Sequence, residues 1–215
     1  MAKLKLEQAK VVYLGLPKLP NKLKTKIIKL AKDIELDESA RIWTENFHKN
    51  TIRAVSHVYG RGATILTNDM LEEVNAVYSP YFNERIFATV GKLENTYTDG
   101  LPAESPPHCD RYRQMSINYL LTTGGDDVRT CFFKNPRHTY NLAQAENDLY
   151  ENLELDFKIT IPAEHWHSYN VQYYHSVENI YSQRLIFSIV LESNPDFDTF
   201  KQKYQNLILE PLCIY

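Results

Sequence analysis

The stretch PPHCDRYRQ, residues 106–114, places a histidine and an aspartate one residue apart. On an extended backbone the side chains of His108 and Asp110 leave the chain on the same face, so both can reach one metal ion. Imidazole nitrogens and carboxylate oxygens are ordinary ligands of divalent transition metals. The pair alone is equally consistent with two solvated polar residues on a loop, so its interpretation depends on partners elsewhere in the chain.

Such partners occur about 70 residues later, where His175 precedes Arg184 by nine residues. Arg184 opens the apolar run RLIFSIVLE, and a guanidinium in a β-sheet core is costly unless it meets an anion. Two histidines and one aspartate form a facial triad that leaves three positions open on non-haem Fe(II). A bidentate 2-oxo acid and dioxygen would fill those positions, with Arg184 binding the far carboxylate of the acid.

With these motifs, residues 93–192 resemble the 2-oxoglutarate and Fe(II)-dependent dioxygenases, especially their prolyl-hydroxylase-like branch. The similarity is carried by NTYTDGLPAESPPHCD, by INYLLTTGGDDVRTCFF, and by HSV with the later arginine. It implies a double-stranded β-helix in which iron is bound by His108, Asp110 and His175. It further implies that Arg184 binds 2-oxoglutarate and that the cosubstrate pocket is lined by Tyr97 and by Tyr119 or Asn118.

The activity implied by the resemblance is hydroxylation, coupled to oxidative decarboxylation of 2-oxoglutarate by O2. The branch suggests a peptidyl proline or another protein side chain as substrate, and a small molecule stays open. One departure concerns the distal ligand, because EHWHSYNVQYYH contains two rival imidazoles, His165 and His167. They precede Arg184 by 19 and 17 residues, which fits the family's spacing less well than the nine of His175.

Two other classes of function remain as alternatives. A zinc-dependent hydrolase can use two histidines and an aspartate, but it normally needs a nearby carboxylate base and gives no role to Arg184. A jelly-roll binding module without redox activity would be favoured if one ligand were missing, and all three are present.

The elements that must position these residues fall into two groups. Amphipathic helices are predicted at 21–34, with Asn21 as cap, at 68–80, ending at Pro80, and at 196–209. Strands are predicted at 11–15, 85–97, 114–121, 128–133, 156–161 and 184–192, and a long surface loop at 135–154.

This order predicts a mainly β fold with flanking helices, and the resemblance specifies a jelly-roll, cupin-like core. We expect a single domain over residues 1–215. Residues 1–84 would be a helical support region with one short strand, 85–192 the catalytic jelly roll, and 193–215 a C-terminal helix and tail.

Charge is spread unevenly over the chain. The formal net charge is -3, yet residues 1–32 hold nine lysines and a single acid, Glu7. The lysines alternate with apolar residues at helical spacing, which favours a solvated helix face over a contact with nucleic acid, although such a contact stays open. No run approaches the roughly 20 apolar residues of a membrane span, and no secretory leader is recognisable. Three cysteines without metal-site spacing fit a reducing, cytoplasmic location.

Overall fold

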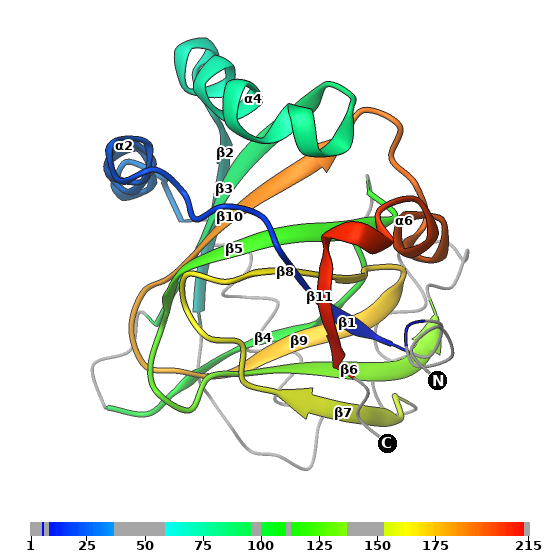
Figure 1. Ribbon diagram of the computed structural model, residues 1–215. Helices are drawn as coiled ribbons and strands as arrows, with labels where there is room; N and C mark the ends of the chain where they lie inside the picture. Colours follow the sequence, from blue (N-terminus) through cyan, green and yellow to red (C-terminus); the bar gives the residue numbers. More distant parts are fainter. Residues whose placement is uncertain are drawn as a thin grey trace, which may run out of the picture.

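The computed structural model describes residues 6, 9–36, 59–95, 100–110, 113–136 and 153–212 of the chain. These residues form two antiparallel β-sheets with helices on one side (Figure 1). The seven-stranded sheet has the order β11-β1-β8-β5-β10-β3-β2, and the four-stranded sheet has the order β4-β9-β6-β7. The strands are β1 (Val11–Leu14), β2 (Tyr59–Ile65), β3 (Ile86–Asn95), β4 (Ala103–His108), β5 (Met115–Thr123), β6 (Arg129–Pro136), β7 (Leu155–Ile159), β8 (Trp166–Asn170), β9 (Tyr173–Ile180), β10 (Arg184–Leu191) and β11 (Ile208–Leu212).

The pairing of the eight central strands defines the fold. β3 pairs with β10, β4 with β9, β5 with β8 and β6 with β7, all antiparallel. Along the chain, the first of these strands therefore pairs with the last, the second with the second to last, and so on inward to β6 and β7. This is a long hairpin rolled up between two sheets, a double-stranded β-helix or jelly roll. The predicted fold class is confirmed.

The helices cover the face of the seven-stranded sheet that points away from the four-stranded sheet (Figure 1). They are α2 (Asn21–Lys32), α4 (Asn68–Phe82) and α6 (Phe197–Lys203). The main core lies beneath them and includes Leu23 and Ile27 of α2, Tyr78 of α4, and Val90 and Phe187 of the sheet. Because side chains alternate along a strand, the residues between these core positions point into the interior of the jelly roll.

The strands predicted from apolar runs are all present. Five further strands were not predicted, namely β2, β4, β8, β9 and β11. The strand β4 contains two prolines, and β8 and β9 are rich in His, Ser, Asn and Tyr, so none shows a plain alternation of apolar and polar residues. Most of the predicted 135–154 loop lies outside the described residues.

Three predictions about the helices are wrong. Pro20, not Asn21, is the N-cap of α2, and no side chain in the described residues makes a capping hydrogen bond. The helix α4 passes through Pro80 to Phe82, because Tyr78 and Phe82 pack their shared face into the core, and it ends at Asn83 with φ 52°. The last helix ends at Lys203, since residues 208–212 pair with β1 as strand β11; this long-range pairing overrides the local helical pattern.

Ion pairs occupy part of the lysine-rich helix surface. Lys18 and Lys24 both contact Glu164, and Lys26 of α2 contacts Glu73 of α4. These pairs tie three of the lysines to acidic residues elsewhere in the same chain. None of the helices in the described part of the chain combines the length and the hydrophobicity that a membrane span requires.

Candidate metal centre

Two histidines face each other at one end of the four-stranded sheet. His108 is the last residue of β4 and pairs in register with His175 on β9. Their imidazole ring centroids lie 4.5 Å apart, with an angle of 49° between the ring planes. The β4–β9 pairing thus brings together two residues that are 67 positions apart in the sequence.

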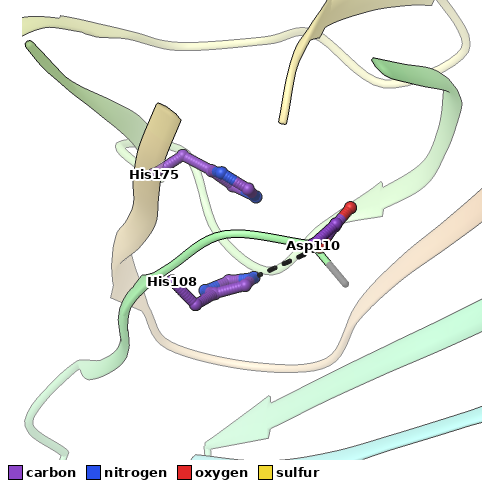
Figure 2. Close-up of side chains that lie close together, drawn as sticks. All are labelled: His108, Asp110 and His175. Atoms are coloured by element: carbon purple, nitrogen blue, oxygen red, sulfur yellow. Dashed lines mark ion pairs between the residues drawn. The ribbon is translucent and has the colours of Figure 1, made fainter. Parts of the chain in front are cut away.

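Asp110 completes the group from the segment that follows β4 (Figure 2). Its Oδ1 lies 3.9 Å from Nε2 of His108. Potential ligand atoms of His108, Asp110 and His175 all lie within 4.8 Å of one another, and Figure 2 shows the three side chains converging. The structure therefore brings together the three residues that the sequence motifs indicated.

Gln172 holds the Asp110 segment against the turn before β9. Its side-chain Nε2 donates to the carbonyl oxygens of Arg113, at 2.7 Å, and Asp110, at 3.4 Å. The backbone N–H of Asp110 donates to the carbonyl oxygen of Val171 at 3.1 Å. The two parts of the candidate site are thus linked by hydrogen bonds as well as by the β4–β9 pairing. Nothing in the sequence singled out Gln172 for this role.

The surroundings of His175 favour one ring tautomer. Its Nδ1 lies 3.1 Å from the carbonyl oxygen of Tyr173, a distance at which a protonated Nδ1 donates a hydrogen bond. A proton on Nδ1 leaves the lone pair on Nε2, the nitrogen that a metal would then bind. His175 as a whole is 4 % exposed, so bulk water competes little for this position.

The environment of Asp110 keeps its carboxylate ionised. Burial raises the pKa of Asp110, but the charges of Arg113 and of the two histidines lower it by more, so the pKa lies below its usual value. Arg113 Nε donates to Asp110 Oδ2 at 2.5 Å. A carboxylate beside two imidazoles is a donor set that suits a divalent transition-metal ion.

Arg184 is a buried cation in the interior of the jelly roll. It begins β10, is 3 % exposed, and donates from Nη1 to the Thr123 carbonyl oxygen at 3.1 Å and from Nη2 to Thr130 Oγ1 at 3.4 Å. Burial lowers its pKa to about 10, so it stays charged at neutral pH. In the described part of the chain its Nε has no hydrogen-bond partner, and no carboxylate forms an ion pair with it. A buried charge of this kind fits an anionic ligand.

Asn118 and Tyr119 point to opposite faces of β5. Tyr119 lies in the core beneath the helices, with its ring centroid 5.0 Å from that of Trp166. Asn118 is 2 % exposed and faces the interior, where its Oδ1 accepts from Ser188 Oγ at 2.8 Å. Of the two alternatives for the pocket lining, the structure therefore brings Asn118 and not Tyr119 to the interior. Tyr97 lies outside the described residues.

The rival histidines lie elsewhere. His165 is exposed beside β8, with Nδ1 2.7 Å from the Ala163 carbonyl oxygen. His167 is buried on the interior side of β8, its ring parallel to that of Tyr169 at 6.0 Å between centroids. Burial lowers the pKa of His167 to about 3, and the positive charges of Arg184 and Arg113 act in the same direction. Neither histidine belongs to the potential metal-ligand group found among the described residues.

No family model matches the sequence, and neither does any curated protein. Solved structures with a similar chain trace include a prolyl-4-hydroxylase of Pseudomonas putida, at 10 % identity and TM-score 0.43 over 88 % of this chain and 97 % of that one. They also include SnoN, a non-heme alpha ketoglutarate dependent epimerase from nogalamycin biosynthesis, at 11 % identity and TM-score 0.48 over 87 % and 80 % of the chains. A 2OG-Fe(II) oxygenase family oxidoreductase from Burkholderia pseudomallei matches at 9 % identity and TM-score 0.42 over 85 % and 88 %.

Proteins of the family that the sequence motifs resemble are thus among the solved structures similar to this chain. At these identities and TM-scores the likeness concerns the course of the chain.

Proposed function

We propose that this protein is a non-haem Fe(II) dioxygenase that uses 2-oxoglutarate and O2 to hydroxylate a substrate. The observation that carries the proposal is the presence, in one jelly roll, of a two-histidine, one-aspartate group and a buried arginine whose Nε has no hydrogen-bond partner among the described residues. A metal site alone would suit many functions. The buried cation adds the requirement for an anion, which a dicarboxylate cosubstrate meets with its second carboxylate.

The residues present fit both groups. His108, Asp110 and His175 are the donor set of the Fe(II) facial triad, which leaves coordination positions for other ligands. The distal carboxylate of 2-oxoglutarate would accept hydrogen bonds from the Arg184 guanidinium, including its Nε, which has no partner in the described part of the chain. Asn118, on the same interior side, would line the space between them.

Iron and 2-oxoglutarate, when bound, would supply the oxidative decarboxylation and the activated oxygen that hydroxylation requires. The protein supplies position and charge. Hydrogen bonding to Tyr173 orients the His175 ring, and Gln172 holds the segment carrying Asp110. The buried Arg184 charge would align the cosubstrate, and the interior side chains of Asn118 and Ser188, 2 % and 6 % exposed, are shielded from bulk water.

The substrate is the open part of the proposal. A peptidyl proline, another protein side chain or a small molecule would each have to reach the metal centre. In such folds specificity arises from the loops beside the site. A direct contact of the lysine-rich helix with nucleic acid gains no support from its ion pairs with Glu164 and Glu73.

The proposal is tested by measuring succinate formation from 2-oxoglutarate in air with Fe(II), for the wild type and for Asp110→Ala. The variant should form no succinate, and its affinity for Mn(II) should fall by at least about 100-fold, because even outer-shell changes cost about 10–100-fold. Near-ultraviolet circular dichroism controls for folding. Full activity in Asp110→Ala would overturn the assignment, and ester hydrolysis by the Zn(II)-loaded protein without any response to 2-oxoglutarate would favour the hydrolase.

A further inference from the structure

We propose that Arg113 is a positioning residue that restricts Asp110 to a single ligand oxygen and thereby keeps the neighbouring coordination position for the 2-oxo acid. This inference rests on the proposed function. It concerns Arg113, which the structure pairs with the candidate metal ligand Asp110.

The two oxygens of Asp110 have different neighbours. Oδ1 lies 3.9 Å from His108 Nε2, on the side of the metal-ligand group, and Oδ2 accepts from Arg113 Nε at 2.5 Å. A carboxylate can bind a metal through one oxygen or through both. A short, charge-assisted hydrogen bond on Oδ2 competes with the second mode, so Asp110 is left with Oδ1 as its ligand atom.

Arg113 is itself held from both ends. Its Nη1 donates to Asn118 Oδ1 at 3.4 Å, and its carbonyl oxygen accepts from Gln172 Nε2 at 2.7 Å. Asn118 is fixed in turn by Ser188, whose hydroxyl donates to the same Oδ1 at 2.8 Å. The Arg113 side chain is 22 % exposed, so water weakens the pair with Asp110 only in part. The guanidinium is therefore held in a defined position beside Asp110.

The two arginines would act on opposite ends of the cosubstrate. Arg184 would hydrogen-bond only a ligand that carries a second, distal carboxylate. Arg113 stands beside Asp110, where the 2-oxo acid would chelate the metal, so its effect should be the same for any 2-oxo acid. The positive charge of Arg113 also partly neutralises the negative charge of Asp110. This would reduce the repulsion between Asp110 and a second anion bound at the metal.

This difference can be measured by calorimetric titration of the Mn(II)-loaded protein with 2-oxoglutarate and with pyruvate, which lacks the distal carboxylate. Arg113→Met should lower the affinity for both acids by the same factor, about 10–100-fold, as expected for an outer-shell partner. Arg113→Lys, which keeps the charge but not the planar Nε donor, should recover part of this loss. Arg184→Met should lower the affinity for 2-oxoglutarate alone.

Three results would overturn the inference. Arg113→Met could leave both affinities within about twofold of wild type, or it could weaken Mn(II) binding without changing the binding of either acid. The third is a loss in Arg113→Met that Arg113→Lys does not recover although near-ultraviolet circular dichroism shows both variants folded. If the wild type binds Mn(II) but neither acid, the proposed function itself fails, and this inference fails with it.

Discussion

The guanidinium of Arg184 spans the interior between the two sheets, donating from β10 of the seven-stranded sheet to Thr130 on β6 of the four-stranded sheet at 3.4 Å. The charge is thereby held inside the jelly roll and away from solvent. On the four-stranded sheet, β9 is the neighbour of β6 and carries His175. The cation and the candidate metal centre thus share adjacent parts of one interior, which is the arrangement that a ligand with two anionic ends requires.

His175, and not His167, should be the distal metal ligand. His175→Ala should lose Mn(II) affinity by at least about 100-fold, because a ligand is removed. His167→Gln, a buried polar replacement on β8, should retain it within about threefold. Calorimetry with Mn(II) measures both, and a loss confined to His167→Gln would reverse the assignment of the two histidines.

Substitutions at Asn118 and Tyr119 should affect different properties. The change at Asn118 should weaken ligand binding, and the change at Tyr119 should lower stability. Asn118→Ala removes an interior amide that holds Arg113 and Ser188, so 2-oxoglutarate binding to the Mn(II)-loaded protein should weaken by about 10-fold, equivalent to about 1.4 kcal/mol. Tyr119→Phe removes a hydroxyl from the core beneath the helices and should cost about 1 kcal/mol of stability with no change in binding. Weaker binding in Tyr119→Phe with none in Asn118→Ala would contradict this placement.

His167 should make the protein sensitive to acid. Burial lowers its folded-state pKa to about 3, whereas the unfolded chain takes up the proton near pH 6.5. Between these values the unfolded state binds more protons, so the free energy of unfolding should fall as pH drops from about 6.5 to about 3, by up to a few kcal/mol. His167→Gln should show a shallower pH dependence in denaturant titrations. An identical pH dependence in the two proteins would exclude a buried neutral His167 as the cause.

The sequence predicted the parts of the structure that local patterns determine. Apolar runs located the strands that carry the main core, and two widely separated motifs indicated the three residues that converge at the candidate centre. The resemblance supplied the winding of the sheets, which local periodicity does not specify. The helical prediction for residues 196–209 failed because pairing of β11 with β1 lies outside the reach of a local pattern.

The hydrogen bonds that support the site could not be predicted from the sequence, because they also depend on long-range packing. Arg113 and Gln172 act through hydrogen bonds whose partners depend on how β5, β8 and β9 are packed together. Asn118 and Tyr119 could not be distinguished until the core face of β5 was known. The only available signal for Arg113 was its position three residues after Asp110, which many surface arginines share.

The central claim is tested most directly by anaerobic titration of the apoprotein with Fe(II) and then 2-oxoglutarate, following the weak visible charge-transfer absorption of the iron-bound 2-oxo acid. The wild type should develop this band, His175→Ala should not, and Arg184→Met should need about 10-fold or more 2-oxoglutarate, since it loses charge-assisted hydrogen bonds to the distal carboxylate. Absence of the band in the wild type, with Fe(II) binding unaffected by His175→Ala, would contradict the account and favour the jelly-roll binding module.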